Sequence, residues 1–433
     1  MKLFISILFV LLLSVSNVFS QWVKINSGLT DYLFSAFFLD SQTGFTGGQS
    51  ASDGFGKIYK TTNGAATWNL CFATSSGNER FESLFFINQQ TGWAGSYYNM
   101  VYKTTNSGVN WSPYYGYGRI RKIFFINSET GWLAGSHGSM KTTNGGLNWF
   151  YTLGNTAAYG IHFFDHLTGV VTATAGSSSD IYRTTNGGTN WLVVYNEPDG
   201  TIINTFSFLN ENTGFATGGY KATFKTTNKG LNWVRLSKDP MSSVQFSDLR
   251  GLKFIDANLG YACGQYVIPG PSTQYGTVFN KTTNGGISWQ NVTVTPYPSY
   301  AFEDIQIPDG QNGFLFGSSG QVYKSTNAGF VSINSISTEI PKFYSLHQNY
   351  PNPFNPSTKI KFEIPLNAVN TRWGVSLRIY DILGREVRTL VNENLRPGVY
   401  EADFNAADLP SGVYFYKFNA WEFSETKRMV LIK

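Results

Sequence analysis

The stretch Lys141-Thr-Thr-Asn-Gly-Gly-Leu-Asn-Trp149 decides the fold, because close copies of it recur along most of the chain. A block that returns at a period of roughly forty residues indicates a repeat architecture rather than one irregular domain. The seventh copy has Ser332 where a full copy has Trp. The seven copies carry their asparagine at Asn63, Asn106, Asn144, Asn186, Asn228, Asn284 and Asn327.

A second recurring sequence feature, or mark, precedes each of these boxes. It is a glycine that is usually followed by an aromatic residue, and an Asp or Asn stands four positions before it. The Asp or Asn predicts an Asx turn, in which the side chain accepts hydrogen bonds from the backbone that follows. Short apolar runs such as residues 85–87 and 93–95 predict strands between the marks. Each unit therefore predicts about four short antiparallel strands, which is typical of one β-propeller blade.

The box resembles the Asp-box of bacterial neuraminidase repeats, with Asn in place of the commoner Asp and with Ala65 at one glycine position. In such families the box joins the third and fourth strands of a blade, which implies that the seven asparagines hold the fold. Over residues 22–335 the pattern is similar to the seven-bladed propellers of the photosystem II assembly factor family. It also resembles the propellers of sialidases and of xyloglucan-active glycoside hydrolases. The expected fold is all-β, with a seven-bladed β-propeller at residues 21–335 followed by a small C-terminal β-sandwich.

The beginning of the mature chain supplies what the seventh box lacks. Gln21-Trp22-Val-Lys-Ile25 is similar to the segment that starts at Trp289 in the sixth copy. We therefore expect the N-terminal strand to complete the last blade and to close the ring, which removes two free sheet edges.

Composition and the first residues indicate export. Lys2, the apolar run of residues 3–13 and the small residues before position 20 predict a signal peptide at residues 1–20. The apolar run is too short to span a membrane.

The composition narrows the class of protein. Charged residues are 14% and aromatic residues 16% of the 433, which argues against disorder and against a nucleic-acid-binding protein with a basic face. Two cysteines exclude a disulfide scaffold and a thiolate zinc site. The sequence predicts no transmembrane segment, no metal, no cofactor and a monomer.

The C-terminal part reads as a separate module, at residues 346–433 after a linker at residues 336–345. Alternating apolar runs separated by Pro-Gly and Leu-Gly turns predict a small β-sandwich. Its motifs resemble those of the type A sorting domain of the type IX secretion system: Asn349-Tyr-Pro-Asn-Pro-Phe-Asn-Pro356, Tyr380-Asp-Ile-Leu-Gly384, Leu409-Pro-Ser-Gly-Val-Tyr414 and Lys427-Arg-Met-Val-Leu-Ile-Lys433. The resemblance implies that the export machinery is a partner, and that the chain is secreted or attached to the outer cell surface by way of the periplasm.

Candidate functional residues come from comparing the repeats with one another. Two positions before each Asx residue the repeats have Phe six times and Ile307 once, which predicts core. Six positions before it the residues vary, and these positions begin the expected innermost strand, where loops gather around the channel mouth. The candidate ligand-binding residues at or beside these positions are Arg80, Glu82, Arg119, Arg121, Tyr159, Asp248, Arg250, Glu303 and Asp304.

Two functions remain open at this stage. The first is an exported binding module that takes a glycan or a protein at the channel face. The alternative is an extracellular glycoside hydrolase of sialidase or xyloglucanase type, for which Glu82 and Asp304 could act as a carboxylate pair. A basic residue also precedes every box, and the seven could attract an anionic glycan. Long side-chain stems that cover the neighbouring Trp of the box and keep sheet edges soluble explain the same pattern.

Overall fold

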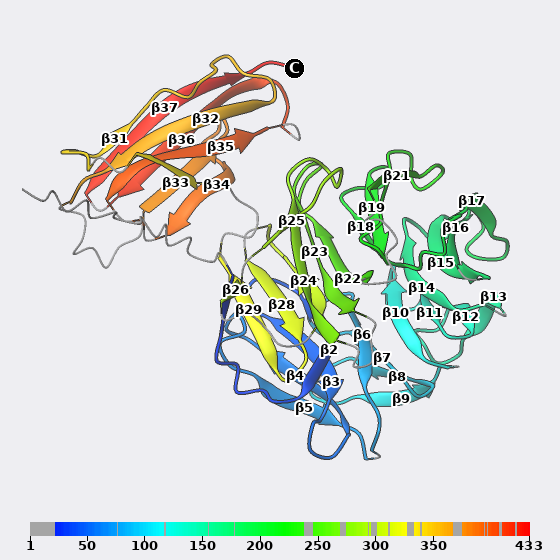
Figure 1. Cartoon of the computed structure of the whole chain (residues 1–433). Coiled ribbons are helices and arrows are strands. Elements are labelled where there is room, and N and C mark those ends of the chain that lie inside the picture. The colour runs from blue at the N-terminus through cyan, green and yellow to red at the C-terminus, as the bar shows by residue number, and fades with distance from the viewer. Residues whose placement is uncertain are drawn as a thin grey trace, which may run out of the picture.

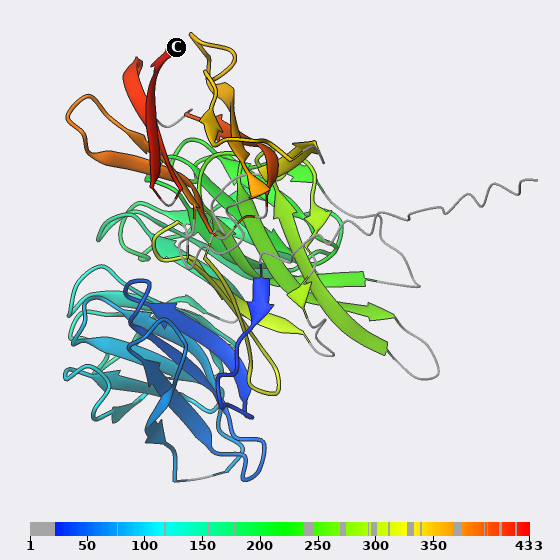
Figure 2. The ribbon, with the colours of Figure 1, turned by 90° about the vertical axis from the view of Figure 1, so that its left-hand side faces the viewer.

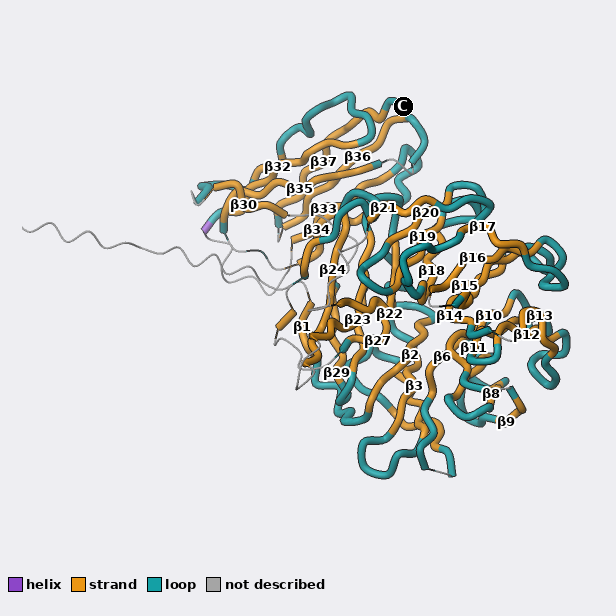
Figure 3. Tube along the Cα trace, turned by 45° about the vertical axis from the view of Figure 1, so that its right-hand side comes forward, coloured by secondary structure: helices purple, strands orange, loops and turns teal. Residues whose placement is uncertain are grey.

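In the computed structural model, almost all of the described chain consists of strands and loops (Figure 3). None of the described residues belongs to a helix that is long and apolar enough to cross a membrane. The expected signal peptide and Asn327 of the seventh box lie outside the described residues. The described residues are 22–75, 77–116, 118–154, 156–176, 178–237, 246–268, 274–292, 294–295, 301–310, 312–326, 333–337, 340–366, 375–393, 395, 397–406, 409–420 and 422–433.

Six four-stranded antiparallel sheets follow one another along the chain, each with its strands in sequence order (Figure 1). The first strand of each sheet packs against the first strand of the next, so these strands line the centre. The strands of the first three sheets are β2 (Tyr32–Phe38), β3 (Gly44–Gln49), β4 (Gly56–Thr61) and β5 (Asn69–Ala73); β6 (Phe81–Phe86), β7 (Gly92–Ser96), β8 (Met100–Thr104) and β9 (Ser112–Tyr115); and β10 (Ile120–Phe125), β11 (Gly131–Gly135), β12 (Gly138–Thr142) and β13 (Phe150–Gly154).

The next three sheets repeat the same order, and in the sixth the first three strands are each nine residues long. Their strands are β14 (Ala158–Phe163), β15 (Gly169–Ala175), β16 (Ser178–Thr184) and β17 (Leu192–Tyr195); β18 (Ile203–Phe208), β19 (Gly214–Gly218), β20 (Thr223–Thr226) and β21 (Val234–Ser237); and β22 (Phe246–Phe254), β23 (Gly260–Ile268), β24 (Gln274–Thr282) and β25 (Gln290–Asn291).

The seventh sheet closes the ring, and its order is β26-β1-β29-β28-β27. Its strands are β1 (Trp22–Lys24), β26 (Val294–Thr295), β27 (Phe302–Gln306), β28 (Gly313–Gly317) and β29 (Gln321–Ser325). The N-terminal strand β1 pairs antiparallel with β29, with Val23 opposite Lys324, so the start of the chain supplies the fourth strand of the last blade. Strand β27 in turn contacts β2 of the first blade. The yellow strands of the last blade lie beside the blue strands of the first (Figures 1 and 2). The predicted seven-bladed propeller and its closure are confirmed.

Aromatic stacking joins neighbouring blades. Trp93 in the second blade stacks on Phe125 in the third, with ring centroids 3.5 Å apart. Phe314 of the last blade stacks on Phe38 of the first at 4.0 Å, so the contact continues across the closure. The predicted core position two residues before each Asx turn thus packs between blades. The glycine that begins the second strand leaves room for this ring, because a Cβ on Gly131 would lie 2.4 Å from Phe125.

The boxes are hydrogen-bonded hairpins between the third and fourth strands. In the second blade the Asn106 Oδ1 accepts the amide of Asn110 at 2.9 Å, and the Thr104 hydroxyl oxygen accepts the amide of Gly108 at 2.9 Å. The other five described boxes have the same asparagine bond at 2.9–3.0 Å. An acceptor oxygen is what this turn requires, and an uncharged Asn supplies it as well as Asp does.

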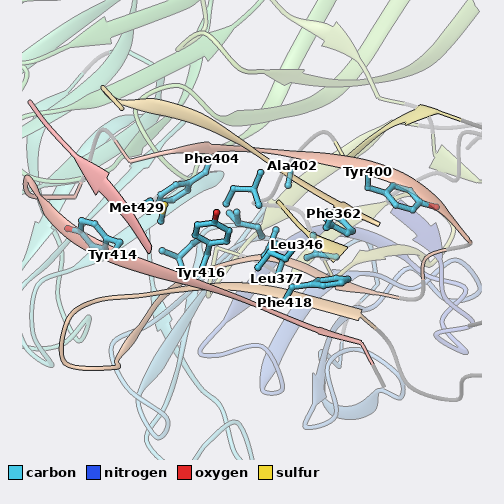
Figure 4. Close-up of a cluster of buried hydrophobic side chains, with 14 of the residues drawn as sticks. Leu346, Phe362, Leu377, Tyr400, Ala402, Phe404, Tyr414, Tyr416, Phe418 and Met429 are labelled. Carbon is cyan, nitrogen blue, oxygen red and sulfur yellow. The ribbon is translucent and has the colours of Figure 1, made fainter. Parts of the chain in front are cut away.

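The C-terminal module consists of two four-stranded sheets, with the orders β30-β35-β32-β31 and β34-β33-β36-β37. Leu346 and Phe362 of the first sheet and Leu377, Tyr416 and Phe418 of the second share one buried core (Figure 4). The strands are β30 (Ile333–Ser337), β31 (Ser345–Leu346), β32 (Ser357–Ile364), β33 (Val375–Tyr380), β34 (Glu386–Glu393), β35 (Gly398–Asn405), β36 (Gly412–Ala420) and β37 (Phe423–Leu431).

The module reaches further back along the chain than its expected start at residue 346. Strand β30 lies where the end of the propeller and the linker were expected, and it pairs antiparallel with β35, with Ile333 opposite Ala402. Backbone pairing with an edge strand does not depend on a marked side-chain pattern, so the sequence did not indicate this strand. Neither cysteine forms a disulfide: Cys263 is buried and Cys71 is half-buried.

Candidate functional site

Every innermost strand has a β-bulge near its start. In the pairing of β10 with β11 the register shifts between Ile120 and Lys122, which leaves Arg121 as the extra residue. The other six innermost strands shift at the corresponding place. A bulge turns its extra side chain out of the ladder, and bulges are frequent beside functional sites. The residues at this position are Phe34, Glu82, Arg121, Tyr159, Asn204, Arg250 and Glu303.

All seven of these side chains line a single cavity of about 530 Å³ at the centre of the ring. Arg80, Arg119, Lys122 and Asp248 complete its lining. Eight of the nine residues that the sequence suggested are therefore brought together, and Asp304 is not among them. The positions that vary between the repeats converge on one place, whereas the positions that stay constant pack between blades.

Glu82 organises one side of the cavity. Its carboxylate accepts from Arg80 Nε at 2.6 Å and from Arg119 Nε at 2.5 Å, and its side chain is almost fully buried. The Arg80 guanidinium lies over the ring of Tyr97, 4.2 Å from its centroid, and also over Phe34 at 4.9 Å. Ion pairing and stacking together hold these two arginines in place.

Arg250 organises the opposite side. It pairs with Asp248 at 3.2 Å and with Glu303 at 2.5 Å. Asn204 Nδ2 donates to Asp248 at 2.7 Å and thereby fixes that carboxylate. Burial raises the pKa of Glu303, and Arg250 opposes the shift only in part.

Two cations in the cavity, Arg121 and Lys122, differ from the paired arginines. Among the described residues, neither Arg121 nor Lys122 forms an ion pair. Arg121 lies over the ring of Tyr159 at 4.4 Å and donates to the carbonyl of Ala158 at 3.3 Å. Burial and the neighbouring Arg119 lower the pKa of Arg121. With five cationic and three anionic side chains in its lining, the cavity has a surplus of positive charge.

Asp304 lies one residue beyond the bulge and is buried between blades instead of facing the cavity. Its Oδ2 accepts the amide of Ala36 at 2.9 Å, and its Oδ1 accepts the amide of Ile305 at 2.7 Å. Both oxygens are thus occupied by the fold. The carboxylate pair of Glu82 with Asp304, considered from the sequence, is not formed at the cavity, because Asp304 is turned toward the backbone of the first blade.

The basic residues before the boxes also have structural partners. Lys103 lies over the ring of Trp93 in its own blade, 5.4 Å from the centroid. Lys324 Nζ donates to the carbonyl of Gly64 across the closure at 2.9 Å, and Lys60 and Arg183 donate to the next box in the same way. The six lysines lie over the aromatic residue of the second strand, rather than over the box Trp that the sequence suggested. These contacts favour a role in joining blades over attraction of an anionic glycan.

Of the eleven lining residues, Phe34, Asn204 and Lys122 were not among the candidate ligand-binding residues, and Lys122 also lies outside the bulged position. It stands five positions before its Asx turn, where the other blades have Ser, Gly, Thr or Asp. A single long cation among small residues at that repeat position was the signal. Without knowledge of the bulge, two adjacent residues of one strand are not expected to line the same cavity, because side chains alternate between faces.

Comparison with protein families identifies the C-terminal module. A family model described as the secretion system C-terminal sorting domain matches residues 348–433. This module is a type IX sorting domain. The sorting domain implies interaction with the type IX secretion machinery and secretion to the cell surface or exterior. Comparison with curated proteins gives no match for the chain.

Solved structures resemble the propeller. YCF48 bound to D1 peptide matches with a TM-score of 0.55 at 17% identity, covering 71% of this chain and 98% of that one. PorZ, a bacterial surface component of the type-IX secretion system of Porphyromonas gingivalis, has a TM-score of 0.52 at 14% identity, covering 94% and 60%. The GH74 xyloglucanase from Xanthomonas campestris has a TM-score of 0.56 at 10% identity, covering 94% and 75%. Similarity at these identities shows a shared fold and carries no activity with it.

Proposed function

We propose that the chain enters the periplasm by its N-terminal signal, leaves the cell through its sorting domain and acts outside as a binding module. The propeller takes a glycan or a protein segment at the central cavity. One observation carries this proposal: seven bulged positions that carry five different residue types face a single cavity, while the rest of each blade repeats. A cavity that needed only to be filled would be lined by repeated apolar residues.

The charges of the cavity favour a ligand with an anionic group. Arg121 and Lys122 both line the cavity, and the carboxylates of the cavity are already paired with other arginines. An incoming carboxylate or sulfate would offset this surplus. Tyr159 and Phe34 offer ring faces on which a sugar or a side chain can pack. A similar propeller is known in complex with a peptide, which supports a protein segment as one form of ligand.

Binding by the purified mature chain tests the proposal. Glycan arrays and peptide libraries that include acidic members are screened with the parent chain and with Arg121→Gln, and Arg428→Gln on the sorting domain serves as the control. We expect an acidic ligand whose binding is lost in Arg121→Gln, is kept in Arg428→Gln and weakens with salt. Ligands that bind all three proteins equally would contradict a site at the cavity.

Glycoside hydrolysis is the second candidate, and one observation favours it. The raised pKa of Glu303 suits a general acid, and Asp248 and Glu82 line the same cavity. Chromogenic glycosides tested against the parent chain and Glu303→Gln decide between the functions. Turnover that disappears in Glu303→Gln would establish the enzyme, whereas ligand binding without turnover supports the binding module.

A further inference from the structure

The turn between β33 and β34 of the sorting domain displays two aliphatic side chains to solvent. Ile382 and Leu383 at its tip are 71% and 72% exposed. They belong to the sequence motif by which the domain resembles its family, yet they take no part in its core. Since the fold does not use these side chains, their apolar surface is available to a partner.

The turn is held in one conformation by Asp381. Its Oδ1 accepts the amides of Leu383 at 2.9 Å and Arg385 at 3.0 Å, and its Oδ2 accepts from Arg385 Nε at 2.8 Å. Gly384 has a φ of 77°, which a residue with a side chain adopts at a cost. A turn fixed in this way presents its apolar tip at little entropic cost on binding.

A shallow cavity of about 420 Å³ lies beside the tip, on the outer face of the sheet. Tyr380 and Phe415, which are cross-strand partners on β33 and β36, supply its apolar floor. Phe415 is 36% exposed and lies opposite Arg428 on β37. The tip and the cavity thus form one continuous surface, which we call the turn surface: Tyr380, Ile382, Leu383, Phe415 and Lys417.

Positive charge borders the turn surface. Lys417 lies on β36 two residues beyond Phe415, and neither Lys417 nor Arg428 forms an ion pair within the part of the chain that the structure describes. The acidic groups nearby are already paired, Asp381 with Arg385 and Glu386 with Arg378. An apolar patch with an unpaired basic border is complementary to an apolar side chain within an acidic rim.

We propose that the turn surface is the site at which the type IX export machinery docks on this chain. The occupant is a protein of that machinery with an apolar side chain set among Asp or Glu residues. The match of the module to the sorting-domain family supplies the partner, and the exposed tip and basic border supply its chemistry. The inference rests on the sorting domain and is independent of the ligand of the propeller.

Export of the full chain tests the proposal. The parent chain and the double variant I382S/L383S are produced in a bacterium with a type IX system, and the amounts in periplasm, cell surface and medium are measured. We expect export to fall by about tenfold or more and the chain to accumulate in the periplasm, because truncation of two central apolar contacts costs that much affinity. Leu366→Ser removes a similarly exposed aliphatic side chain elsewhere on the domain and should be exported normally.

Two further measurements separate docking from folding. Thermal unfolding should give the same midpoint for I382S/L383S and the parent chain, since both side chains are exposed. Lys417→Glu should reduce export while Lys417→Arg preserves it, because the charge and not the side-chain identity is recognised. Normal export of I382S/L383S, or equal export of Lys417→Glu and Lys417→Arg, would overturn the proposal.

Discussion

The carboxylate of Asp304 in the last blade accepts the backbone amide of Ala36 in the first blade, with 2.9 Å between Oδ2 and N. A hydrogen bond at the equivalent repeat position joins the second and third blades, where the Ser83 hydroxyl oxygen accepts the amide of Ile123 at 2.9 Å. Each acceptor follows a bulge, which turns it toward the next blade. Asp304 therefore belongs to the closure of the ring.

Replacement of Asp304 should destabilise the propeller, and the loss should be larger when the new side chain has no oxygen to accept the backbone hydrogen bonds. Asp304→Ala leaves the buried amide of Ala36 without this partner, at a cost of about 1–3 kcal/mol. Asp304→Asn keeps an acceptor oxygen and should cost less. Urea unfolding of the three proteins measures both values. Equal stability of Asp304→Ala and the parent chain would contradict this role.

The pH dependence of stability should also differ between Asp304→Asn and the parent chain. Burial raises the pKa of Asp304 above its ordinary value of 3.8, and Lys122 opposes the shift. The folded state then holds the proton more tightly than the unfolded state, so this group's contribution to stability falls as pH rises above the unfolded pKa. Urea unfolding from about pH 4 to about pH 7 should show the parent losing stability relative to Asp304→Asn. A constant difference would show that the carboxyl does not titrate in this way.

Trp22 should account for much of the stability of the closed ring. It is fully buried and packs edge-on against Phe279 and Tyr261, with centroids 5.0 and 5.6 Å away. Trp22→Ala should cost about 3–5 kcal/mol, and deletion of residues 22–26 should cost more. Val23 is 53% exposed on the same strand, so Val23→Ala should change stability by less than about 0.5 kcal/mol. Thermal unfolding checks the three variants, and a small effect of Trp22→Ala would contradict closure by this strand.

Gly131→Ala tests the stacking between blades. The added Cβ would lie 2.4 Å from the Phe125 ring, which is buried and packs against both Trp93 and Trp149. We expect a loss of about 1–3 kcal/mol from overpacking. Gly154→Ala is the matched control, because its Cβ would meet nothing within 4 Å. Denaturant unfolding of both variants measures the difference, and equal stabilities would be the contrary result.

Glu82→Gln should change stability and binding in opposite directions. The substitution removes the partner of Arg80 and Arg119, which should destabilise the fold by about 2 kcal/mol. It also increases the surplus of positive charge in the cavity, so an anionic ligand should bind more tightly and with a steeper salt dependence. Calorimetric titration at two salt concentrations checks the second effect. Weaker binding of the acidic ligand would indicate that Glu82 itself contacts it.

The repeats made most of the propeller predictable. The spacing of the boxes, the Asx residues and the glycines each reflects a local turn or a close approach, and such features act within a few residues of sequence. Eight of the eleven residues that line the cavity were found because positions that vary between blades stand out against positions that do not. Asp304 was misplaced, and Lys122 was missed, because a bulge changes which side chains share a face and has no clear sequence signal here.

By itself the sequence determined the number of blades, the closure by Trp22, and the presence of a separate sorting module, since these depend on backbone turns and on apolar patterning. The tertiary structure alone decided which charges meet. Glu82 of the second blade pairs with Arg119 at the start of the third, whereas Arg121 and Lys122 form no ion pair among the described residues. Electrostatic pairing acts through space over a few ångströms, so it depends on how the ring brings distant strands together.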